Sequence, residues 1–147
     1  MKSKKLLSII LALAMMFSVL PASTVLVYAD VITETISADT TWNDGDTVGG
    51  VTISGGTVTI NGDVGITAAI TIKGDVTFTG GGTLNRMSTS GNLIKVESGS
   101  LTLGNVTIDG NDVIISDNGA VAAINMADGT VIMNDGAKIT NHKRTSG

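Results

Sequence analysis

Apolar residues alternate with threonine in short runs from residue 51 onward, and this alternation most constrains the fold. Val58 and Ile60 flank Thr59, and the pattern recurs in Ile70-Thr71-Ile72, Val76-Thr77-Phe78, Leu101-Thr102-Leu103 and Val106-Thr107-Ile108. A period of two over such short runs is typical of strands with one buried face. The runs are separated by glycine, asparagine and aspartate, which tolerate the positive φ angles of sharp corners. The sequence therefore predicts an all-β protein of short strands, with no helix after Ala29.

Like residues also recur at a fixed offset of 30, in the pairs Ile94 and Ile124, Val96 and Met126, Gly99 and Gly129, Leu101 and Val131, and Leu103 and Met133. Asn111 and Asn141 share this offset, and Gly62-Asp63-Val64 is echoed 12 residues later by Gly74-Asp75-Val76. Such repetition predicts stacked coils, with aliphatic ladders inside and asparagine above asparagine at the corners. A β-sandwich would carry longer strands and more aromatic residues.

Two segments carry a family resemblance: NLIKVESGSLTLGNVTIDGN (residues 92–111) and GTVIMNDGAKITN (residues 129–141). They resemble the right-handed parallel β-helix repeats of large bacterial surface proteins in the pectin-lyase-like group, which includes adhesin-like and polysaccharide-degrading members. The resemblance covers about residues 41–141 and implies a right-handed parallel β-helix of about four to five coils. The calcium-binding nonapeptides and regular hexapeptides of other β-helices are absent.

The N-terminus has the three parts of a secretory signal peptide. Lys2, Lys4 and Lys5 precede an apolar run over residues 6–20, and Val27-Tyr28-Ala29 supplies a cleavage site. We expect cleavage after Ala29 and a secreted or cell-surface protein. The alternative is an uncleaved membrane anchor, for which the run of 15 residues is shorter than the roughly 20 that span a bilayer.

The predicted mature chain divides into an N-terminal capping segment at residues 30–50 and β-helix repeats at residues 51–147. Trp42 is the expected plug of the first coil, and the alternative is a surface tryptophan on a loop.

The chain contains no cysteine, which excludes disulfides and lipid attachment through a cysteine at the cleavage site. A net charge of about −7 from residue 30 onward argues against nucleic acid and anionic membranes as partners.

The resemblance to polysaccharide-degrading enzymes implies catalytic motifs that this chain lacks in part. Polygalacturonase-like members carry paired aspartates and a His-Gly motif, whereas the single histidine here, His142, precedes Lys143. Pectate-lyase-like members use an arginine beside calcium-binding carboxylates, and Arg86 is the candidate in mid-chain. Its nearest acidic residues in sequence are Asp75 and Glu97. We favour a solvated turn arginine, and no catalytic residue is predicted.

Aspartates in successive turns are weak candidates for a calcium site, because stacked turns can bring hard oxygen ligands together. Aspartate beside glycine or asparagine is also ordinary turn chemistry, which we favour. We therefore predict no cofactor, with calcium as the one alternative; the candidates are Asp109, Asp112, Asp128 and Asp135, with Asp117 in the same series. The basic cluster His142-Lys143-Arg144 is either a solvated corner or a contact for acidic glycans.

The sequence predicts a non-catalytic stalk or adhesion module at the cell surface. The alternatives are the N-terminal portion of a pectate-lyase-like enzyme and a glycan-binding module, although the two aromatic residues of the predicted mature chain, Trp42 and Phe78, offer few platforms for sugars. Expected partners are extracellular glycans or proteins. No polar cap follows the strand expected at residues 138–140, so the last coil is expected to belong to a longer protein or to dock end to end with another copy.

Overall fold

The computed structural model of the chain describes residues 31–115 and 122–144, which form strands, turns and bends. None of these residues lies in a helix, so this part of the chain holds no helix that could cross a membrane. The all-β prediction is confirmed. The predicted signal peptide at residues 1–29 and the calcium candidate Asp117 lie outside the described residues.

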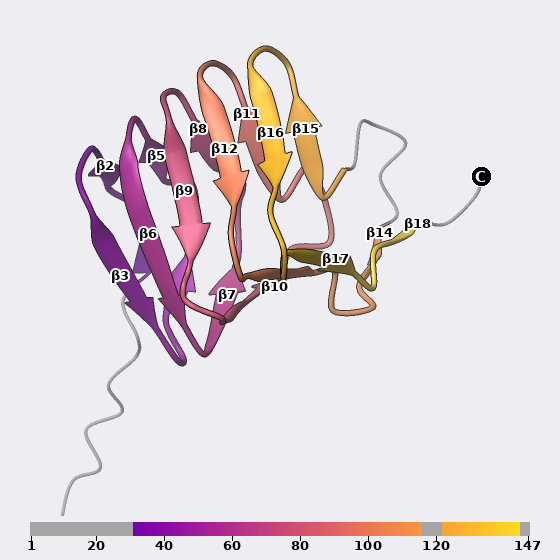
Figure 1. Ribbon diagram of the computed structural model, residues 1–147. Helices are drawn as coiled ribbons and strands as arrows, with labels where there is room; N and C mark the ends of the chain where they lie inside the picture. The colour runs from indigo at the N-terminus through magenta and orange to yellow at the C-terminus, as the bar shows by residue number, and fades with distance from the viewer. Residues whose placement is uncertain (1–30, 116–121, 145–147) are drawn as a thin grey trace, which may run out of the picture.

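Three parallel sheets, named A, B and C here, are wound by successive turns of the chain, as Figure 1 shows. Sheet A contains β1 (Val31–Ile32), β4 (Thr47–Val48), β7 (Asp63–Ile66), β10 (Thr83–Arg86), β13 (Thr107–Asp109) and β17 (Lys138–Thr140). Sheet B contains β2 (Thr35–Ile36), β5 (Thr52–Ile53), β8 (Ile70–Ile72), β11 (Ile94–Val96) and β15 (Ile124–Met126). Sheet C contains β3 (Thr40–Asn43), β6 (Gly56–Asn61), β9 (Val76–Thr79), β12 (Ser100–Leu103) and β16 (Thr130–Met133).

Each coil passes through sheets A, B and C in turn, so that each strand inside a sheet pairs with the equivalent strand of the coils before and after it. A short parallel pair of β14 (Ile114–Ile115) and β18 (Lys143–Arg144) is added beside the last coils. This is the arrangement of a parallel β-solenoid, as the repeats predict. The segment expected to form the cap supplies β1 to β4, and its strands pair in register with those of the next coil.

The coils lengthen along the chain. In sheet A the register joins, in order, Val31, Thr47, Gly65, Asn85, Asp109 and Thr140. Successive coils therefore contain 16, 18, 20, 24 and 31 residues. The offset of 30 is confirmed for the last pair of coils, where Ile94 pairs with Ile124 and Leu101 with Val131. It is not a fixed period, because the strands stay short while the loops between them grow.

Two smaller parts of the repeat prediction are wrong. The echo at an offset of 12 does not mark stacked residues, since Val64 lies on β7 and Val76 on β9 of the same coil. Asn141 also does not hydrogen-bond Asn111: its Nδ2 donates to both carboxylate oxygens of Asp109, at 3.0 and 3.1 Å. In sheet A the offset between these two coils is 31, since Asp109 pairs with Thr140, so Asn141 is one residue out of line with Asn111.

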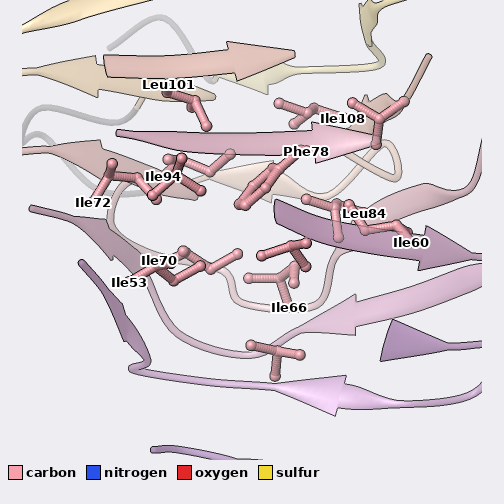
Figure 2. Close-up of a cluster of buried hydrophobic side chains, with 14 of the residues drawn as sticks. Ile53, Ile60, Ile66, Ile70, Ile72, Phe78, Leu84, Ile94, Leu101 and Ile108 are labelled. Atoms are coloured by element: carbon pink, nitrogen blue, oxygen red, sulfur yellow. The ribbon is translucent and has the colours of Figure 1, made fainter. Parts of the chain in front are cut away.

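Inward-facing side chains form the core, which is almost entirely aliphatic (Figure 2). Ile70, Ile94 and their neighbours stack along the axis of the solenoid, each fully buried by the coils on either side. Trp42 on β3 is 1% exposed, and its ring lies 6.0 Å from that of Phe78 on β9, tilted by 59°. The expected inward position of Trp42 at the first coil is confirmed.

Glycine is required at one corner where backbones of three coils approach closely. Gly99 and Gly129 have φ angles of +75° and +100°, which favour glycine. A Cβ atom on Gly99 would collide with the backbone of Gly74, and one on Gly129 with the backbone of Gly99. The column Gly74, Gly99 and Gly129 therefore lets the turns between sheets B and C stack without spreading the coils apart.

Candidate functional site

Arg86, the one mid-chain arginine, ends β10 with its side chain pointing into the solenoid. It is the one charged side chain fully buried among the described residues, so the prediction of a solvated turn arginine is wrong. Nη1 donates to the carbonyl oxygen of Gly91 at 2.9 Å and Nη2 to that of Ala122 at 3.2 Å. Burial lowers the pKa of Arg86, because the surroundings disfavour the charged form.

No carboxylate compensates this buried charge within the part of the chain that is described. Glu97, one of the two acidic residues nearest to it in sequence, instead pairs on the surface with Lys95 at 2.6 Å and Lys73 at 3.4 Å. Asp75 accepts a hydrogen bond from Ser100 Oγ at 2.8 Å. The calcium-and-arginine arrangement implied for a lyase is therefore not assembled around Arg86 by these residues.

His142 lies close enough to Arg86 to be affected by its charge although 56 positions separate them in the sequence, since His142 follows β17, which pairs with β13, the neighbour of β10. Its Nε2 is buried and has no hydrogen-bond partner. Burial first, and then the positive charge of Arg86, lower the pKa of His142, against smaller opposing effects of a hydrogen bond with the Ile108 backbone and the charge of Asp109. The imidazole therefore favours its neutral form.

Asp109 organises the corner after β13. It accepts hydrogen bonds from the Asn111 backbone N–H at 2.6 Å, from Thr140 Oγ1 at 3.3 Å and from Asn141 Nδ2. Asn111 and Asn141 both have a φ of +54°, a left-handed conformation that asparagine tolerates better than most residues. The carboxylate thus joins two coils and holds both turns, which is the turn role expected for it.

The other calcium candidates do not gather around Asp109. Asp112 forms an exposed ion pair with Lys143 at 2.8 Å, and Asp128 Oδ1 accepts the N–H of Gly129 at 2.8 Å. Asp135 is exposed in the turn between β16 and β17. Over residues 31–115 and 122–144, no three histidine, aspartate or glutamate side chains come together in a way that would hold a metal ion.

The predicted basic cluster is also divided by the structure. His142 faces inward, whereas Lys143 is exposed and bound to Asp112. His142 is therefore not part of a solvated corner, and the alternative of a contact for acidic glycans stays a prediction. His142 precedes β18, which begins at Lys143.

An open groove of about 430 Å³ runs across the outer face of sheet A, and sequence reasoning did not find it. It is lined by turn residues and by outward positions of β4, β7 and β10, namely Gly45, Asp46, Thr47, Asp63, Gly65, Asn85, Met87 and Asn111. Met87 lies across Gly65, where a Cβ atom would collide with its Sδ. Among the described residues, two aspartates and no basic residue line this groove, so it is an acidic, hydrogen-bonding surface.

A local sequence signal could have revealed Arg86, but none could have revealed the groove. Arg86 is predictable as inward-facing only through its phase with Leu84, since the two share one face of β10. The groove depends on the register between coils of unequal length, which the offset of 30 does not supply.

Comparison with known proteins finds no protein-family model, no curated protein and no solved structure that matches this chain.

Proposed function

We propose that this chain is a secreted or cell-surface β-solenoid module with a structural role, acting as a stalk or adhesion element that holds a regular acidic surface outside the cell. In this proposal residues 1–29 are a cleaved signal peptide, and the solenoid is a right-handed β-helix of the pectin-lyase-like, adhesin-like type. No catalytic step is assigned to it.

The observation that carries the proposal is the structural use of the side chains best suited to chemistry. Arg86 binds the carbonyl groups of Gly91 and Ala122, and Asp109 binds residues of two coils. Coils joined by backbone pairing along three sheets form a stack that is suited to act as a spacer. Each added coil lengthens the stack by repeating the same inner columns of side chains. An extended acidic surface also stays soluble and resists nonspecific association.

Export is tested by producing the full chain in a bacterial secretion host and determining the mass of the product. We expect a product that begins at Asp30, outside the cytoplasm. The matched control is Ala29→Phe, because a bulky residue at the cleavage position blocks processing. A full-length product retained in the cytoplasm would contradict the proposal.

The absence of catalysis is tested separately with the secreted product. We expect no depolymerisation of acidic or neutral polysaccharides, measured by reducing ends and by absorbance of unsaturated products. The control is Thr77→Ala on β9, which changes the outer face of sheet C instead. Activity that is lost in Arg86→Lys or Asp63→Asn but kept in Thr77→Ala would overturn the structural role.

The groove on sheet A favours one second candidate, a glycan-binding module. Asp46, Asp63 and Asn85 present hydrogen-bond acceptors and amide donors across three coils, which fits the hydroxyl groups of a sugar chain. Because no basic residue lines the groove, it favours neutral glycans over polyuronates, whose carboxylates it would repel.

This candidate is tested by calorimetric titration with neutral oligosaccharides and with oligogalacturonate. We expect measurable binding of a neutral ligand alone, weakened at least several-fold by Asn85→Ala and unchanged by Thr77→Ala. Preferential binding of the polyuronate would overturn the ligand class argued from the charge of the groove.

A further inference from the structure

Six threonines form two columns on the outer face of sheet C, named the threonine face here. The register pairs three of them along β3, β6 and β9 and three along β6, β9 and β12; the columns are Thr41, Thr59 and Thr79, and Thr57, Thr77 and Thr102. These four strands lie side by side along one wall of the solenoid in Figure 1. The columns form because the threonines alternate with buried residues of the same strands.

The hydroxyl groups of the threonine face are not used inside the protein. Among the described residues none of the six forms a side-chain hydrogen bond, whereas Thr67 Oγ1 donates to the Val48 carbonyl oxygen and Thr140 Oγ1 to Asp109, each at 3.3 Å. Thr41 is exposed and the other five are half-buried. Since a hydroxyl group can both donate and accept, the face presents a regular array of hydrogen-bonding groups to the solvent.

The spacing of this array is set by β-geometry in two directions. Paired strands lie about 4.7–4.9 Å apart, and alternate residues along one strand are about 6.6 Å apart. Threonine is stiff about its first side-chain torsion, so its hydroxyl and methyl groups repeat with the backbone. Oxygen atoms in a surface of hexagonal ice repeat at similar spacings in two directions. The threonine face therefore offers hydroxyl groups close to the positions that lattice oxygen atoms occupy.

The threonine face is also uncharged, unlike the outer faces of sheets A and B. No charged side chain of the described residues lies between its two columns, and Asp39 at its border accepts the Thr57 backbone N–H at 2.7 Å. On sheet B a single column of threonines runs into a lysine: Thr35, Thr52, Thr71 and Lys95. Because charged groups are costly to strip of their own hydration water, the neutral face is the one suited to a neutral lattice.

We propose that the threonine face binds ice, with its hydroxyl groups taking lattice positions and its methyl groups lying between them. Each contact is weak, and the contacts add up only where a rigid scaffold holds them at the spacing of the ligand. Parallel strands in register supply that scaffold over four coils. Threonine favours strands in any case, but strand propensity does not require two aligned columns without a charge. This activity does not depend on a stalk or adhesion role.

The experiment uses residues 30–147 and measures thermal hysteresis, which is the gap between the melting and freezing points of a single ice crystal. Retention of the protein in slowly grown ice is the second measurement. Thr59→Lys places a charge between Thr41 and Thr79, and the matched control is Thr52→Lys, at an equally half-buried threonine between two threonines of sheet B. Circular dichroism establishes that each variant keeps its β-structure. The pair Thr59→Ala and Thr52→Ala repeats the comparison without an added charge.

We expect the wild type to lower the freezing point below the melting point, to give the ice crystal facets and to be retained in ice. Thermal hysteresis should fall at least several-fold in Thr59→Lys, fall less in Thr59→Ala and stay at the wild-type value in both Thr52 variants. A wild type without hysteresis overturns the proposal, as does an equal effect of the substitutions at Thr59 and Thr52. Retention on powdered cellulose without retention in ice also overturns it, because the face would then bind a crystalline polysaccharide. None of these outcomes bears on export or catalysis.

Discussion

The first and last coils have the same three-sheet plan, but one end of the solenoid is closed and the other is open. Trp42 in the first coil is almost completely buried and reaches the ring of Phe78, two coils further along. Met133 lies in the same inner column as Phe78 and Leu103, yet half of its surface is exposed. An inward position in a solenoid is therefore buried only where another coil or a large side chain covers it.

Among the substitutions that test this comparison, Trp42→Ala is expected to have the largest effect on stability. We expect the free energy of unfolding to fall by about 3–5 kcal/mol, because the substitution removes a large buried ring and leaves a cavity in the closed end. Urea unfolding measures the loss. Trp42→Phe should recover part of it by retaining contact with Phe78. A loss below about 1 kcal/mol would mean that the closed end does not depend on this side chain.

Arg86→Ala tests the middle of the molecule and should have the next largest effect. It removes the donors that bind the carbonyl oxygens of Gly91 and Ala122, and we expect a loss of about 2–3 kcal/mol in unfolding free energy. Arg86→Lys keeps the charge but not the fork of donors, so it should be intermediate. Equal stability of Arg86→Ala and the wild type would show that the cost of burying the charge cancels its hydrogen bonds.

The sequence predicts the strands well and their stacking only in part. Alternation fixes which face of each strand turns inward, as Leu101 and Leu103 illustrate, because period two follows from strand geometry. The offset of 30 correctly pairs β11 with β15 and β12 with β16. It does not predict the shorter early coils, because loops tolerate insertions that the buried columns do not record.

The candidate site was less predictable for a physical reason. Asp109 is recognisable as a turn residue from its neighbour Gly110, and the structure gives it that role. The proximity of Arg86 and His142 brings together residues far apart in the sequence, through coils of 24 and 31 residues whose lengths no local pattern specifies. Side-chain chemistry alone therefore could not place them together.

His142 provides a third, smaller test through pH. Its pKa is lowered in the folded protein by burial and by Arg86, so the unfolded chain binds this proton more readily than the folded one. The stability that follows from the neutral imidazole is complete above the unfolded pKa of about 6.5 and is lost as pH falls below it. The effect should be modest, because Asp109 and the Ile108 backbone partly oppose the shift.

Melting temperature is measured between pH 8 and pH 5 in the wild type and in His142→Gln. The difference between the two proteins should change below about pH 6.5, with the wild type losing relative stability. All other ionisable groups are common to the two proteins, so the difference isolates the histidine. Parallel curves for the two proteins would contradict the predicted contribution.

The smallest effect is expected at the open end, where Met133→Ala in dilute monomer should reduce the unfolding free energy by less than about 1 kcal/mol. Leu103→Ala, one coil earlier in the same column, should cost about 2–5 kcal/mol because it leaves a cavity between two covering coils. A solvent-facing methionine leaves no enclosed cavity. Similar losses at the two positions would mean that the last coil is covered in solution.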